Sequence, residues 1–147
     1  MSNYGIDIRI KGKLEEVKPS VVEALKAQGF GVLTEIDVQK TLKQKIGVDF
    51  KPYLILGACN PQLAHQALSA EESIGLLLPC NVVLKQEGDM VEVSILDPEV
   101  MFSVVDPEIN KKLAELPREA KGRLQAVLTA LETQEKNKGS SSSRSPR

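Results

Sequence analysis

The stretch "YLILGAC" at residues 53–59 constrains the fold most, because it is apolar at both odd and even positions. A strand points successive side chains to opposite faces of a sheet, so this pattern is typical of a strand covered on both faces. Asn60 and Pro61 follow at once, and they are a preferred helix N-cap and a preferred first helical residue. The sequence therefore predicts a central, buried strand that leads directly into a helix.

Other apolar segments alternate with helical patterns along the chain. Strand-like segments lie at residues 4–10, 30–38, 74–84 and 90–96, and helical periodicity at residues 13–30, 38–47, 60–68 and 120–131. Pro19 interrupts the first helical pattern, so that helix either starts there or is kinked in its first turn. Asp97-Pro98 and Asp106-Pro107 suit two further helix starts. This order predicts an α+β fold, with one antiparallel sheet and helices packed on one face.

The length and composition indicate one domain with a polar tail. A chain of 147 residues that is 41% hydrophobic and 27% charged is typical of a single globular domain. We assign residues 1–135 to this domain. The last segment, "KNKGSSSSRSPR" at residues 136–147, has too few apolar side chains to offset the entropy of ordering, so we expect a disordered tail.

The charge and the aromatic content disfavour several classes of partner. A net charge of −1 gives no general attraction to nucleic acid or to anionic lipid. Aromatic residues make up only 3% of the chain, which leaves few rings for stacking bases. The first ten residues lack the apolar core of a signal peptide, and no apolar run approaches the roughly 20 residues of a membrane span. We expect a cytoplasmic protein without nucleic-acid or membrane partners, in which both cysteines stay reduced.

The two cysteines are candidates for a reactive or ligand-binding site. Cys59 directly precedes Asn60, and the positive end of a helix that starts there lowers the pKa of a nearby thiol. Cys80 follows Pro79 at a break in an apolar strand, so both thiols are expected where strands end. The alternative is that both are small buried hydrophobic residues, as free cysteines often are.

The sequence predicts no metal site. Zinc takes four ligands, or three and an open position, and the spacing from Cys59 to Cys80 is not that of a zinc knuckle. His65, the one histidine, lies about 130° from the centre of the buried face of its predicted helix. It is therefore expected on the surface.

The second strand carries a pair of carboxylates. Regular alternation divides its side chains into two faces: Phe30, Val32, Thr34, Ile36 and Val38 on one, and Leu33, Glu35 and Asp37 on the other. Glu35 and Asp37 would then lie about 6–7 Å apart, a spacing that suits a hard cation or acid–base catalysis. The alternative is that Asp37 caps the following helix while Glu35 pairs with a neighbouring lysine.

Three blocks of the sequence resemble one known family. "GFGVLTEIDV", "LGACNPQLAHQAL" and "GLLLPCNVVL", in this order, are similar to the family called domain of unknown function 302, over about residues 4–132. The resemblance implies a fold like that of the TATA-binding protein, in which a curved antiparallel sheet lies under helices, and it implies a dimer. It implies no assigned activity. Pro19 and the serine-rich tail depart from the family pattern.

These observations favour a non-catalytic ligand-binding or interaction module that acts as a homodimer, with a small apolar or anionic ligand. The candidate binding or reactive residues are Cys59, Cys80, Asn60, Glu35 and Asp37. The alternative is a thiol-dependent protein, for redox chemistry, sulfur handling or soft-metal binding, that uses Cys59 and Cys80. A hydrolase or transferase that uses Glu35 and Asp37 is a third hypothesis, disfavoured because no nucleophile–base pair is visible. The sequence identifies no cofactor.

Overall fold

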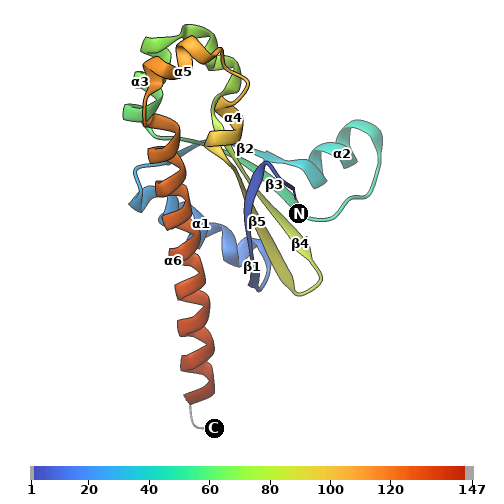
Figure 1. Cartoon of the computed structure of the whole chain (residues 1–147). Helices are drawn as coiled ribbons and strands as arrows, with labels where there is room; N and C mark the ends of the chain where they lie inside the picture. The colour runs from blue at the N-terminus through green and yellow to red at the C-terminus, as the bar shows by residue number, and fades with distance from the viewer. Residues whose placement is uncertain (1, 145–147) are drawn as a thin grey trace.

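The structure is a computed structural model that describes the backbone of residues 2–144 and the side chains of residues 2–137. Five strands form one sheet in the order β1-β5-β4-β3-β2, and every neighbouring pair is antiparallel (Figure 1). The strands are β1 (Gly5–Lys11), β2 (Gly31–Asp37), β3 (Tyr53–Cys59), β4 (Cys80–Glu87) and β5 (Met90–Leu96). Together with the helices, this confirms the predicted α+β class.

The helices lie on one face and at one end of the sheet. They are α1 (Leu14–Ala27), α2 (Val38–Ile46), α3 (Pro61–Ala70), the short 3₁₀ helix η1 (Glu72–Leu77), α4 (Pro98–Phe102), α5 (Pro107–Leu113) and α6 (Leu116–Arg144). Helices α1 and α6 pack together and cover one face of the sheet, while α3, α4 and α5 gather at one end (Figure 1). Helix α2 protrudes to one side of the molecule, and the C-terminal end of α6 also extends beyond the sheet (Figure 1).

The core lies between the sheet and the layer of α1 and α6. Alternate residues of β3, β4 and β5 point into it, and Leu56, Leu84 and Val93 are completely buried. Helices α1 and α6 contribute apolar stripes in which Leu25 and Leu124 are equally buried. Aliphatic side chains therefore build the core, as expected of a chain with so few aromatic residues.

Several helix boundaries follow from local sequence signals. Asp97-Pro98 and Asp106-Pro107 begin α4 and α5, as predicted. Gly47 ends α2 with φ of +67°, a left-handed conformation that a residue with a Cβ rarely adopts. Helix α1 begins at Leu14 and runs through Pro19, so the helix does not start at the proline.

The prediction for the faces of β2 was wrong, because the strand contains a β-bulge. Its register against β3 shifts between Val32 and Thr34, which leaves Leu33 as an extra residue. Beyond the bulge the alternation is inverted, so Thr34 and Ile36 lie on the open face of the sheet. Glu35 instead lies on the helix side, where it forms a salt bridge with Lys18 of α1.

Strand β3 lies inside the sheet between β4 and β2, but only one of its faces is covered by helices. Leu54, Leu56 and Ala58 are buried on that face. Tyr53 and Ile55, on the other face, are only half-buried. The apolar stretch therefore identified an inner strand correctly, but it overestimated how much of that strand is covered within one chain.

Helix α6 extends into the segment that the sequence predicted to be a disordered tail. Helix α6 continues from the domain through residue 136 to Arg144, and residues 145–147 of the expected tail lie outside the described residues. Leu131 is the last buried residue of α6 among the described side chains. Within the described part of the chain, no helix is long and apolar enough to cross a membrane.

Candidate functional site

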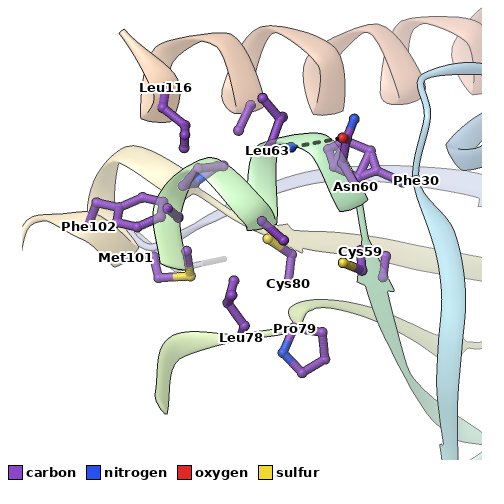
Figure 2. Close-up of a pocket in the computed structure, with 15 residues that line it drawn as sticks. Phe30, Cys59, Asn60, Leu63, Leu78, Pro79, Cys80, Met101, Phe102 and Leu116 are labelled. Atoms are coloured by element: carbon purple, nitrogen blue, oxygen red, sulfur yellow. Dashed lines mark hydrogen bonds between the residues drawn. The ribbon is translucent and has the colours of Figure 1, made fainter. Parts of the chain in front are cut away.

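A small apolar cavity of about 40 Å³ lies where β3 ends and β4 begins (Figure 2). Its walls come from the three helices α3, α4 and α6 and from both strand ends, and they include Cys59, Cys80, Leu63, Ala64, Ala67, Leu78, Pro79, Met101, Phe102, Leu116 and Ala120. None of the lining side chains is a carboxylate, an amine or a guanidinium, and Asn60 supplies the amide. The cavity therefore suits an uncharged, apolar molecule.

Asn60 is the N-cap of α3, the helix that covers one side of the cavity. Its side-chain oxygen Oδ1 accepts a hydrogen bond from the backbone N–H of Leu63 at 3.2 Å, and Asn60 is itself only 7% exposed. This is the N-cap that the sequence predicted, with Pro61 in the first turn. The cap sets the direction in which α3 leaves β3, and it thereby places Leu63 over the cavity (Figure 2). Ala67, one turn further along α3, also lines the cavity.

Both cysteines lie at strand ends and face the same cavity. Cys59 is the last residue of β3 and Cys80 is the first residue of β4, and both are half-buried free thiols. Burial raises the pKa of the Cys80 thiol to about 11, and the neighbouring Cys59 adds to this shift. Cys80 is therefore a neutral thiol at pH 7, which suits an apolar wall better than a nucleophile.

The structure does not bring the two carboxylates of β2 to the cavity. Glu35 and Asp37 pair with Leu56 and Leu54, several residues along the sheet from Cys59, and neither lines the cavity. Asp37 caps α2 by accepting a hydrogen bond from the backbone N–H of Lys40 at 2.9 Å. The salt bridge of Glu35 and the cap of Asp37 are the structural roles that the sequence offered as the alternative to a site.

The structure also gives no support for a metal centre built on these residues. His65 is exposed on α3, as predicted, and it does not line the cavity. Among the described residues, no group of three or more His, Cys, Asp or Glu side chains is placed to hold a metal ion.

Sequence reasoning missed half of the cavity wall. Met101 and Phe102 of α4, and Leu116 at the start of α6, close the side opposite the strand ends (Figure 2). Asp97-Pro98 predicts the start of α4, but no local pattern shows that the apolar residues of α4 face Cys80. These contacts join segments far apart in sequence, and they are fixed only when the helices pack.

Comparison with known families identifies the fold family. The sequence profile described as "Domain of unknown function DUF302" matches residues 6–131 of this chain. The chain belongs to the DUF302 family. A crystal structure described as an uncharacterized conserved protein DUF302 from Bacillus stearothermophilus is 30% identical in sequence, with a TM-score of 0.78. The similarity covers 88% of this chain and 99% of that one. A search of curated proteins finds no match.

Proposed function

We propose that this DUF302 protein is a non-catalytic binding domain that acts as a homodimer and takes a small, uncharged, apolar molecule into the cavity at the ends of β3 and β4. The observation that carries the proposal is the chemistry of the wall. The side-chain oxygen of Asn60 is occupied in capping α3, and the Cys80 thiol stays protonated at pH 7. Such a wall offers no ionised group to polarise a substrate, but it excludes water from an apolar guest.

The size of the cavity limits the ligand. A dry cavity of about 150 Å³ accommodates benzene or xenon, whereas this one measures about 40 Å³. A guest larger than a few atoms must therefore displace part of the wall. Met101 is the side chain suited to move, because its unbranched thioether has several accessible rotamers.

Xenon tests this proposal, because it is apolar, uncharged and small. Dissolved xenon should shift the amide NMR signals of Leu63, Ala67 and Met101 in a saturable manner. Ala64→Leu adds three carbon atoms at a half-buried wall position and should abolish the shifts. The matched control, Ala130→Leu on the exposed face of α6, should bind as the wild type does. Equal binding by both variants, or no saturable shift in the wild type, would contradict the proposal.

A thiol-dependent function is the second candidate, and it is favoured by one observation: cysteines from two different strands face one cavity. Two thiolates suit a soft ion such as Cu(I). The raised pKa of Cys80 opposes this candidate, because its thiol must lose a proton before it can bind the ion or attack. Alkylation of the native protein at pH 7 distinguishes the two functions: rapid labelling of either cysteine supports the thiol candidate, and labelling only on unfolding excludes it.

A further inference from the structure

Residues 31–50 form a folded segment that has no buried side chain. This segment comprises β2, α2 and the start of the loop to β3, and each of its residues is exposed or only half-buried. Its apolar content is nevertheless high. Five large hydrophobic side chains are exposed to water: Leu33, Ile36, Ile46, Val48 and Phe50. Exposed apolar side chains that are concentrated in one segment of a chain indicate an interaction site.

Helix α2 lacks a core of its own. It has nine residues, none of them buried, whereas isolated helices shorter than about 12–15 residues are marginal in water. Val38, Leu42 and Ile46 nevertheless form an apolar stripe at intervals of four residues. Val38 and Leu42 are half-buried against the chain itself, while Ile46 is 66% exposed. The C-terminal end of the stripe, at Ile46, is therefore left uncovered by the rest of the chain. Helix α2 also protrudes from the body of the molecule (Figure 1).

The row of the open face that contains Ile36 is apolar only next to this segment. Across the sheet from β2, Ile36 pairs with Ile55, and Ile55 pairs with Val83. The same row then becomes polar, with Ser94 on β5 and Asp7 on β1, whose side chains share a hydrogen bond. The apolar row of Ile36, Ile55 and Val83 thus lies beside the exposed side chains of residues 31–50 and extends that surface.

We propose that a second copy of this chain covers residues 31–50 and the apolar row, in an isologous two-fold interface. This inference rests on the homodimer in the proposed function and assigns the surface that forms it. Twenty residues of the segment match the 20–30 residues that each partner contributes to an interface of standard size. Strand β2 is a free edge of a wholly antiparallel sheet, and a two-fold axis at this edge sets the two β2 strands antiparallel.

The charges of the segment favour a second copy over a strongly charged partner. Residues 31–50 carry three acids and three lysines, so two copies meet without net repulsion: Glu35, Asp37 and Asp49 against Lys40, Lys43 and Lys45. Within one chain Glu35 already pairs with Lys18 and Lys43 with Asp49, so few of these charges are left unpaired at the interface. The bulge at Leu33 disrupts regular pairing at this edge, so side-chain packing supplies most of the contact.

Substitution of Ile46 tests the surface. The wild type should sediment with twice the single-chain mass of 16.1 kDa, and Ile46→Asp should weaken the dimer at least tenfold in Kd. Val104→Asp is the matched control, because Val104 is also an exposed apolar residue, at 73%, but lies outside the segment. This variant should dimerise as the wild type does. An unchanged Kd for Ile46→Asp overturns the assigned surface alone, whereas a monomeric wild type overturns the homodimer as well.

If Ile46→Asp fails to fold, hydrogen exchange on the wild type tests whether α2 lies in the dimer interface. Dilution through the dissociation range should accelerate amide exchange in α2, while amides of β5 in the core remain protected. Exchange in α2 that does not depend on protein concentration overturns the surface.

Discussion

Two helix N-caps, the amide of Asn60 and the carboxylate of Asp37, differ in burial, and that difference predicts unequal losses of stability. Asn60 caps α3 and Asp37 caps α2, each through a side-chain oxygen that accepts a backbone N–H. The bond of Asn60 is buried, whereas the bond of Asp37 is exposed to water. When Asp37→Ala removes the cap, water can satisfy the freed N–H of Lys40. No water is available to the N–H of Leu63 after Asn60→Ala.

The free-energy costs follow from this accounting. Loss of an exposed cap costs about 0.5–1 kcal/mol, which we expect for Asp37→Ala. A buried N–H left without an acceptor adds a desolvation cost of about 1–3 kcal/mol, so we expect a total of about 1.5–4 kcal/mol for Asn60→Ala. At about 2–4 °C per kcal/mol for a domain of this size, the melting temperature should fall by about 3–16 °C in the buried case.

Urea unfolding followed by far-UV circular dichroism measures both losses, since the chain has no Trp for fluorescence. The variants are compared at one protein concentration, because dimerisation makes stability depend on it. Asn60→Ser keeps an acceptor at the cap and should recover at least half of the loss. Equal losses for Asn60→Ala and Asp37→Ala would show that burial of the Asn60 cap adds nothing to its contribution to stability.

Three further outcomes are expected. Gly57→Ala should destabilise the protein by more than 1 kcal/mol, measured by urea unfolding, because a Cβ at Gly57 would overlap Thr34 Oγ1 and approach Pro79 Cγ to 2.8 Å. A wild-type unfolding free energy would show that the strand relaxes easily. The raised pKa of Cys80 means that the folded state retains a proton that the unfolded state loses, so stability should fall as the pH rises from about 9 to about 11. Cys80→Ala should lack this component of the decline, and an identical pH profile for the variant would count against the buried thiol. Truncation after Asn137 should leave the melting temperature within about one degree of the wild type, because residues 138–147 are polar; a fall of several degrees would show that they pack on the domain.

The sequence predicted those parts of the fold that depend on near neighbours. Asn60-Pro61, Asp97-Pro98 and Gly47 are local signals, and the helices begin or end where they predict. The faces of β2 could not be predicted, because the bulge at Leu33 is a property of its pairing with β3 rather than of β2 alone. One extra residue was enough to move Glu35 to the helix side.

The candidate site was predictable to the same extent. The two thiols at strand ends follow from local patterns, whereas the opposite wall depends on long-range packing. Helix α4 is only five residues long, and Met101 and Phe102 reach the cavity because α6 packs against α4 from the far end of the sequence. The net charge of the chain bears on its classes of partner. It gives no information about burial, so it could not predict that residues 31–50 lack any buried side chain.

Native mass spectrometry of the purified protein tests the homodimer and the occupied cavity together, because one spectrum reports the oligomer and any retained ligand. We expect a complex of two 16.1-kDa chains that carries an additional small mass, and this mass should be absent from Ala64→Leu. A single-chain species without bound mass, under conditions that preserve known weak dimers, would contradict both the homodimer and the occupied apolar cavity.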